Sequence, residues 1–419
     1  MKKKMISLLL CFSMVMACAA CGAEEESGGE KEASKDKITL EFYQTKREAV
    51  KSMDALIKKF NESQDRIVVE QNNVPDGQDL LMTRMASNDM PPIFTCYPGK
   101  EDFKKMTEQG AVVELTNESF LDNVLDGMKD IVTYDDKIYA LPISASTLGI
   151  YVNKDLFAEL GETEYPETYD ELLALYQKAE DNGITGTVLP YKSAENVEQL
   201  FQGGITSFMD DPISFYGDVE SGKVKSMDNE EYVNALENLL KLNDYAQDDF
   251  LGTSYDQAIA EFANGNALSL ITGLWALPSL KEANPDINCE LIPFPGPTKE
   301  QTRAMVGIDC SLAVATNEDE EIQDAAMEFI RFIGEPENVA EFNGLDKNIP
   351  TLKDVPFDVP EVTAINECIA SGKDARFSVD FWPAGVEGDL RAIYQEFVAT
   401  GDVKATTEKV DQTFTSRAR

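Results

Sequence analysis

Trp275 is the side chain whose place in the sequence best suits contact with a ligand. Residues 267–271 are apolar almost without interruption, which favours a short strand covered on both faces. Thr272 and Gly273 end this run, so the sequence predicts that Trp275 stands on a turn just past a strand. Ligands of open α/β sheets bind at the carboxyl ends of strands, where an indole can lie flat against a sugar ring or another apolar face. The alternative is that Trp275 is a core residue.

Two other side chains, Asp309 and Trp382, occupy positions that contact with a ligand or with another part of the protein would explain. Asp309 lies in the middle of a predicted strand, residues 305–315, that is otherwise mostly apolar. A carboxylate in such a place needs a partner, so Asp309 is either a structural residue at a crossing point or a pocket residue. Trp382 follows Phe381 in an aromatic cluster near the end of the chain, where it either contacts a ligand or packs in the core.

The elements that must position these residues alternate between strand and helix. Residues 38–43, 67–70 and 93–96 read as strands and residues 49–61 and 80–87 as helices, which together make a βαβαβ start. Thr45 and Glu48 have the spacing of a capping box for the first helix. Thr168 with Glu171, and Ser254 with Gln257, have the same spacing before two later helices. This order predicts an α/β fold.

A predicted hairpin and a small polar segment interrupt this alternation. The hairpin spans residues 132–141 and turns at Asp135-Asp136. Residues 142–146 are small and polar and precede a further predicted strand, residues 148–153. Such a segment between two sheet-forming runs is suited to cross from one domain to another. Because 419 residues are many for a single core, two domains are expected.

Composition and charge exclude several classes of function. Asp and Glu outnumber Lys and Arg by 76 to 37, and the net charge of −39 repels nucleic acid and anionic lipid heads. No nucleic-acid partner is therefore expected, and the acidity itself is read as a property of a soluble surface. The chain contains no histidine, which excludes His-based zinc sites, Ser-His-Asp triads and imidazole acid–base catalysis.

The first twenty residues have the features of a secretion signal. Lys2 to Lys4 precede an apolar stretch that runs to about Met16, and small residues follow it. The segment resembles a bacterial lipoprotein signal in which Cys21 is the lipid-modified N-terminus, which implies tethering to the outer face of a cell membrane. Cys18 is the alternative site of lipidation. Residues 21–36, charged and containing Gly and Ser, are then a flexible tether.

The other cysteines show no metal or redox motif. Cys96, Cys289, Cys310 and Cys368 are not spaced as CxxC or as any other recognised ligand set. They are interpreted as small buried apolar residues, with a disulfide between two of them as the alternative.

Taken in order, seven segments of the chain resemble the extracytoplasmic solute-binding proteins of bacterial ABC importers, family 1 type, which bind sugars and oligosaccharides. The segments are ITLEFYQ, ASNDMPPIFTCYPG, KIYALPIS with GIYVNKDLF, YPETYDELL, AEFANGNALSLITGLWAL and AMEFIRFI. The resemblance implies a two-lobe periplasmic-binding-protein-like fold (type II) with a hinge between the lobes. Lobe 1 would comprise residues 37–143 and 309–346, and lobe 2 residues 147–305 and 350–419. The crossings would lie near residues 144–146, 306–308 and 347–349.

The resemblance also assigns candidate contacts to a ligand between the lobes. Trp275 matches a stacking aromatic residue of the family, and Trp382 resembles a late aromatic residue of the second lobe. Gln44 and Tyr97 stand at strand ends of the first lobe, where that family places contacts. Ser144 and Ser146 lie in the first crossing, where some relatives carry an acidic sugar contact. With Asp309 these are the expected ligand-binding residues.

The function that the resemblance implies is capture and delivery of a sugar. The lobes would close on the ligand, and the closed form would be recognised by the membrane permease of an ABC importer. The expected protein is an extracytoplasmic, membrane-anchored monomer without cofactor, metal or catalytic residues. Two alternatives remain. A non-sugar solute, a polyamine or ferric iron, would favour cleft carboxylates and tyrosines. A secreted glycoside hydrolase would need two carboxylates across the cleft.

Overall fold

One mixed sheet of ten strands organises the chain. The computed structural model describes residues 37–74 and 77–418, so the expected signal peptide, Cys21 and the tether lie outside the described residues. The sheet follows the order β2-β1-β3-β10-β6-β8-β7, with β9, β11 and β12 paired to β6 or β10. The strands are β1 (Ile38–Gln44), β2 (Ile67–Asn73), β3 (Ile93–Cys96), β4 (Thr133–Tyr134), β5 (Lys137–Ile138), β6 (Leu141–Asn153), β7 (Thr185–Val188), β8 (Ala267–Gly273), β9 (Cys289–Ile292), β10 (Ala304–Val314), β11 (Ile349–Pro350) and β12 (Asp374–Ala375).

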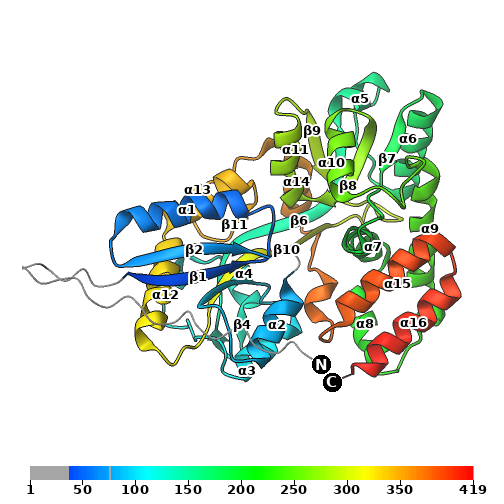
Figure 1. Cartoon of the computed structure of the whole chain (residues 1–419). Helices are drawn as coiled ribbons and strands as arrows, with labels where there is room; N and C mark the ends of the chain where they lie inside the picture. Colours follow the sequence, from blue (N-terminus) through cyan, green and yellow to red (C-terminus); the bar gives the residue numbers. More distant parts are fainter. Residues whose placement is uncertain (1–36, 75–76, 419) are drawn as a thin grey trace, which may run out of the picture. The chain divides into compact units, whose positions relative to one another are not determined.

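Helices cover this sheet on both faces, as in an α/β protein (Figure 1). They are α1 (Val50–Ser63), α2 (Gln78–Ala86), α3 (Glu101–Glu108), α4 (Asp126–Ile131), α5 (Lys154–Glu159), α6 (Tyr169–Asp181), α7 (Ala194–Phe208), α8 (Pro212–Glu220), α9 (Glu230–Leu240), α10 (Tyr255–Ala263), α11 (Leu277–Ala283), α12 (Glu320–Ile333), α13 (Pro336–Asp346), α14 (Thr363–Ala370), α15 (Val386–Thr400) and α16 (Val403–Ser416). Two short 3-10 turns, η4 (Leu274–Ala276) and η6 (Ser378–Phe381), also matter for the site. None of the described helices combines the length and apolar character needed to cross a membrane.

The predicted βαβαβ start is confirmed, but its first helix begins later than expected. β1 pairs in parallel with β2 and β3, and α1 packs its apolar face against this part of the sheet. The capping box predicted from Thr45 and Glu48 is wrong, because α1 starts at Val50 and has no side-chain cap. The reason is a contact between residues that are far apart in the sequence. Thr45 bonds through both its backbone N–H and its hydroxyl to Thr95 Oγ1, at 3.0 and 2.9 Å, which holds the β1–α1 connection in an extended turn.

Two long strands connect the halves of the sheet. β6 is one continuous strand of thirteen residues, all buried, so the strand expected at residues 148–153 begins earlier, at Leu141, and includes residues 142–146. Those residues keep strand geometry because they pair with β10 along most of their length, with Ala145 opposite Ile308, and with β11 on the other side, with Ala145 opposite Ile349. Asp309 lies at an irregularity of β10, between Ile308 and Cys310.

The buried apolar residues form two pairs of clusters, one pair toward each end of these long strands. The first pair draws on residues 40–143 and 310–352. The second draws on residues 150–304 and 359–414. In Figure 1, β6 and β10 pass from the region of β1, β2 and α1 to the region of α7, α10 and α15. The lobe boundaries expected from the sequence stay a prediction.

Local signals elsewhere were read correctly. The hairpin β4–β5 turns at Asp135 and Asp136, both with positive φ. Thr168 and Ser254 each cap a helix through a capping box, with Glu171 and Gln257 as partners. After α10, β8 is buried at every residue and ends at Gly273. The turn η4 that follows carries Trp275, as predicted.

Candidate functional site

A cavity of about 780 Å³ opens between the two pairs of clusters. Pockets for small molecules typically measure roughly 300–1,000 Å³, so this one lies in the upper half of that range. Its walls come from the β1–α1 turn, the β3–α3 turn, the start of α7, the start of α10, the middle of β10, the turns η4 and η6, and the start of α15. Residues distant in sequence thus meet at a site large enough for more than one sugar ring.

Trp275 lies on the wall of this cavity and is partly buried. Its indole covers Gly273, the last residue of β8. A Cβ at Gly273 would lie 2.1 Å from Trp275 Cζ3, which leaves no room for any side chain there. The absence of a side chain on Gly273 therefore fixes where the indole lies.

Gly273→Ala is expected to displace the indole while leaving the backbone unstrained. The φ of Gly273 is −102°, which alanine adopts freely, so the only conflict is with Trp275. We expect the affinity for a bound sugar to fall by about tenfold or more, measured by calorimetry. The control is Gly344→Ala, because no atom lies within 4 Å of the added methyl group. Equal affinities for the two variants would show that the indole position does not matter.

The β3–α3 turn brings an aromatic ring and a cation to the other side of the cavity. Tyr97 follows β3 directly and is half-buried, and burial raises the pKa of its hydroxyl, which stays protonated. Lys100 Nζ lies 4.8 Å from the centroid of the Tyr97 ring, within the range of a cation–π contact. Tyr97 thus offers a neutral hydroxyl and an apolar edge to a ligand.

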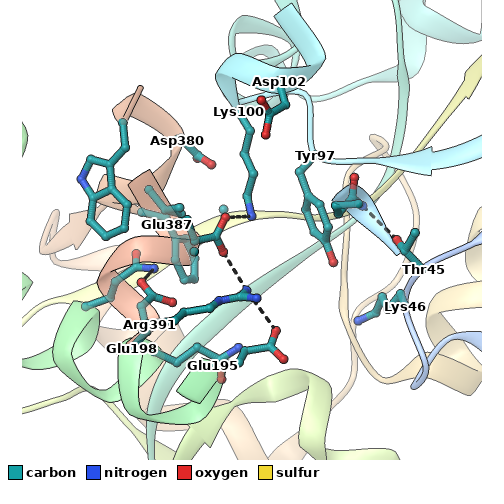
Figure 2. Close-up of a pocket in the computed structure, with 18 of the residues that line it drawn as sticks. Thr45, Lys46, Tyr97, Lys100, Asp102, Glu195, Glu198, Asp380, Glu387 and Arg391 are labelled. Carbon is teal, nitrogen blue, oxygen red and sulfur yellow. Dashed lines mark hydrogen bonds and ion pairs between the residues drawn. The ribbon is translucent and has the colours of Figure 1, made fainter. Parts of the chain in front are cut away.

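A chain of ion pairs runs along the cavity wall from Lys100 (Figure 2). Lys100 Nζ lies 2.6 Å from Glu387 Oε2, and Arg391 lies 2.9 Å from Glu387 Oε1 and 3.5 Å from Glu195. Although burial alone would raise the pKa of Glu387, its two cationic neighbours hold that pKa below the usual value. The pair of Lys100 and Glu387 joins the β3–α3 turn to α15, elements that belong to different pairs of clusters.

Two buried carboxyl groups adjoin this chain. Glu198 on α7 is 1% exposed. Its burial, together with the nearby Glu387 carboxylate, raises its pKa to about 8. Burial also raises the pKa of Asp380 to about 6. Glu198 is therefore mostly protonated at neutral pH and can donate a hydrogen bond. Asp380 is mostly ionised and can only accept hydrogen bonds.

Glu198→Gln is expected to stabilise the protein at high pH only. The folded protein holds the Glu198 proton more tightly than the unfolded chain, whose carboxyl has the ordinary pKa of 4.5. Wild-type stability therefore falls as the pH rises from about 4.5 to about 8, and a glutamine avoids this loss. We expect a melting temperature several degrees higher than wild type at pH 9 and an equal one at pH 5, by scanning calorimetry. The control is Glu237→Gln on an exposed position of α9. A difference of the same size at both pH values would contradict the assignment.

A second buried network ties the three strand crossings together. Lys46 Nζ lies 2.5 Å from Asp309 Oδ2 and 3.9 Å from Asp346. Asn348, just before β11, donates to Asp309 at 2.9 Å and accepts from the Ser146 hydroxyl of β6 at 2.8 Å. The network thus links β6, β10 and the segment before β11, and Asp309 and Ser146 also face the cavity.

The structure brings five of the seven predicted residues to the cavity. They are Trp275, Tyr97, Asp309, Ser146 and Trp382. Trp382 forms part of the wall but is only 3% exposed, with its ring packed edge-on against Tyr216 and Phe414 at centroid distances of 5.2 and 6.1 Å. Trp382 is therefore a core residue at the edge of the cavity, and its contact with a ligand stays a prediction.

Gln44 and Ser144 do not line the cavity. Both are fully buried. Gln44 Oε1 accepts from the backbone N–H of Lys46 at 3.0 Å, because the side chain turns back along the β1–α1 connection. The Ser144 hydroxyl donates to Asp309 Oδ2 at 3.3 Å, because its position on β6 faces β10. These two residues position Lys46 and Asp309.

Sequence reasoning identified Asp309 but missed the other charged residues of the site. Those in the two networks and beside them are Lys46, Lys100, Glu195, Glu198, Asp380, Glu387 and Arg391. One signal was available at Lys100, which stands at the N-cap of α3. A cation is unfavourable at a helix N-terminus, so a lysine there suggests another partner. The i,i+4 pair of Glu387 and Arg391 looked like an ordinary surface pair.

The remaining predictions about the site concern cysteine and metal. Cys96, Cys289, Cys310 and Cys368 are free thiols. No group of three or more His, Cys, Asp or Glu side chains within residues 37–418 is arranged to hold a metal ion. The interpretation of these cysteines as mostly buried thiols agrees with their positions, and only Cys368 is partly exposed.

Comparison with known proteins places this fold and cavity in one family. Residues 55–366 match the family model of the bacterial extracellular solute-binding proteins. The chain is 29% identical over 284 residues to the multiple sugar-binding protein of Streptococcus mutans, and the match covers 66% of each chain. Among solved structures it is similar to the solute-binding protein RafE in complex with raffinose, with a TM-score of 0.79, 21% identity and coverage of 91% of this chain and 100% of RafE.

A second solved structure gives the same result for the fold. A chitin oligosaccharide binding protein matches with a TM-score of 0.80 and 20% identity, covering 92% of this chain and all of that one. At such identities the likeness concerns the fold, while the family model spans most of the chain. The two-lobe α/β fold expected from the sequence is thereby confirmed, and the chain belongs to the bacterial extracellular solute-binding protein family.

Proposed function

We propose that this protein captures a sugar or oligosaccharide in the cavity and delivers it to the permease of an ABC importer. The observation that carries the proposal is the position of Trp275, whose indole lies across Gly273 on the wall of a cavity that is otherwise rich in polar groups. A sugar needs an apolar surface for one face of its ring and oriented donors and acceptors for its hydroxyls. The similarity to a multiple sugar-binding protein and to the raffinose complex supports this.

The proposed contacts divide between the two sides of the cavity. Tyr97 and Asp309 serve on the side of β1 and β3, and Trp275 serves on the side of β8. Ser146 lies between them on β6. Ligand that touches both sides favours the closed arrangement of the lobes, so binding shifts an equilibrium between open and closed forms. The crossings on β6, β10 and the segment before β11 are the proposed hinge.

The test is a glycan array probed with the purified mature protein. We expect neutral oligosaccharides to bind and to raise the melting temperature, without release of reducing ends. Reducing ends would instead establish a glycoside hydrolase. Glu198 and Glu387 are the pair that would suit such an enzyme, because their pKa values are shifted in opposite directions. However, both stand on the same side of the cavity, on the packed helices α7 and α15, whereas a hydrolase needs carboxyl groups on both sides of the bond. Binding of a polyamine or ferric iron in place of any sugar would refute the proposal.

We further propose that the mature protein is a monomer, and that a lipid on Cys21 holds it at the outer face of the cell membrane. Membership of an extracellular family and the lipoprotein-like signal support this location. Mass spectrometry of the N-terminal peptide from cells distinguishes Cys21 from Cys18 as the modified residue. Light scattering of the protein released by Cys21→Ser tests the monomer.

A further inference from the structure

We propose that the cavity selects uncharged oligosaccharides and excludes anionic ones, such as sugars that carry carboxylate or phosphate groups, and that Glu387 is the residue responsible. This inference rests on the proposed function, since it names the class of sugar that the same cavity accepts. It depends on three observations: which partners the cations of the wall have, how many acids surround them, and the presence on the wall of a buried acceptor that has no donor among the described residues, Gln202 Oε1.

Every buried or half-buried cation of the cavity wall is already paired with a carboxylate. Lys46 is held by Asp309 and Asp346. Lys100 and Arg391 are both held by Glu387, at 2.6 and 2.9 Å. An anionic ligand would have to displace a carboxylate side chain of the protein from each of these cations. Because it would exchange one ion pair for another, its charge would bring no net gain in binding free energy. The other basic residues on the wall, Arg47, Lys192 and Arg417, are exposed, where water weakens their attraction.

Acidic residues also outnumber basic ones on the wall. Ten acidic residues line the cavity against six basic ones. The acidic residues are Glu48, Glu101, Asp102, Glu195, Glu198, Asp256, Asp309, Asp380, Glu387 and Asp389, and the basic ones are Lys46, Arg47, Lys100, Lys192, Arg391 and Arg417. Glu198 is mostly protonated, so nine of the ten acids remain to repel a further anion, which weakens the binding of an anionic ligand. An uncharged hydroxyl meets no such repulsion.

One buried acceptor on the wall, Gln202 Oε1, has no donor from the described residues, and it is among several buried polar atoms there without a hydrogen-bond partner, such as Trp382 Nε1. Gln202 is 6% exposed and lines the cavity beside Glu198. Its Nε2 donates to Glu198, but its Oε1 is buried and has no hydrogen-bond partner within the described part of the chain. A sugar hydroxyl can donate to this oxygen, whereas an ionised carboxylate or phosphate has only acceptors to offer. The wall is thus prepared for hydroxyl groups.

Glu387 controls this selectivity because it forms ion pairs with two cations of the wall, Lys100 and Arg391. Replacing it with glutamine keeps its shape but removes the charge that holds Lys100 and Arg391. Lys100 then has no carboxylate within ion-pair distance among the described residues, although Asp380 still attracts it from farther away, and Arg391 keeps its pair with Glu195. The variant therefore presents a cationic pair to the cavity, which is the arrangement that binds carboxylates and phosphates.

The experiment compares matched neutral and anionic sugars by calorimetry. The probes are raffinose, maltotriose, cellotriose and galactotriose, and the forms of the last three in which the primary hydroxyls are oxidised to carboxylates. We expect the wild-type protein to bind the best of the neutral trisaccharides at least about 30-fold more tightly than any oxidised one. We expect Glu387→Gln to bind the oxidised forms about tenfold or more tightly than wild type does.

The matched control is Asp389→Asn, two residues further along α15. Asp389 also lines the cavity, but its partner is the exposed Arg417, at 2.7 Å. This variant removes the same charge from the same helix without releasing Lys100 or Arg391, so the preference for neutral sugars should stay as in wild type. An equal gain in both variants would overturn the role of Glu387 and leave only a general charge effect.

The remaining outcomes separate this inference from the proposed function. An oxidised trisaccharide that binds wild type as tightly as its neutral parent overturns the inference while leaving a sugar-binding protein. No binding of any sugar, on this panel or on the array, refutes the proposed function itself. Should Glu387→Gln fold poorly by calorimetric melting, Glu195→Gln releases Arg391 in part and should show a smaller gain in the same direction. The comparison of neutral with oxidised trisaccharides uses the wild-type protein and does not depend on how any variant folds.

Discussion

Trp275→Ala is expected to weaken sugar binding by about 30-fold or more, which corresponds to ~2 kcal/mol, the level at which an aromatic residue counts as a hot spot. The reason is that its indole is the partly exposed aromatic surface that lies across the end of β8. Removing it leaves the polar groups of the cavity in place but deprives the sugar of the surface on which a ring stacks. The measurement is calorimetry with the best neutral sugar from the array.

The matched control for this variant is Trp382→Ala. Trp382 also reaches the cavity wall, but it is almost fully buried between Tyr216 and Phe414. Its loss should lower the free energy of unfolding by about 3–5 kcal/mol, as for other large aromatic residues in a core. Trp275→Ala should lower it much less, because the indole is only partly buried. The proposal for Trp275 fails if its variant binds sugar as wild type does, or loses affinity only in proportion to its loss of stability.

The sequence predicted those parts of the fold that depend on neighbours in the chain. The capping boxes at Thr168 and Ser254 and the hairpin at Asp135-Asp136 each depend on residues within a few positions of one another, and each was read correctly. The place of Trp275 also followed from local signals, since the apolar run of β8 ends at Gly273. Such signals fix the ends of elements, and in an α/β sheet the ends of strands are where ligands bind.

The parts that could not be predicted depend on residues far apart in the sequence. Lys46 lies 263 residues from Asp309, and this contact, with the Thr45–Thr95 bonds, is the reason that the expected capping box does not form. Lys100 lies 287 residues from Glu387. The pairing of β10 with β6, which makes residues 142–146 part of the strand expected only from residue 148, is likewise long-range. No periodicity in the sequence carries such information.

A second large loss of stability, as great as that of Trp382→Ala, is expected for Lys46→Met. Lys46 is the cation within ion-pair distance of both Asp309 and Asp346, whose side chains are 9% and 0% exposed. Removing it leaves two buried carboxylates without their counter-charge, and breaking a buried pair in this way costs about 3–5 kcal/mol. Urea unfolding of the mature protein at pH 7 measures the loss. Lys51→Met is the control, because its pair with Glu282 has the same kind of partners but is exposed on both sides, so its loss should cost less than about 1 kcal/mol.

The pH dependence of the Lys46→Met variant tests the cause of the loss. Burial raises the pKa of Asp346, and the charge of Lys46 opposes that rise. Without Lys46 the folded protein therefore holds a proton on Asp346 more tightly than the unfolded chain does. A carboxyl group with a raised pKa costs no stability below its unfolded pKa and costs more as the pH rises. The deficit of the variant relative to wild type should thus shrink from pH 7 to pH 5, and Lys46→Met/Asp309→Asn should recover part of it at pH 7. The opposite outcome is a deficit of Lys46→Met that is equal at pH 7 and pH 5, together with a double variant that is no more stable than Lys46→Met. That outcome would mean that Lys46 matters for packing and that the crossings are not held by charge.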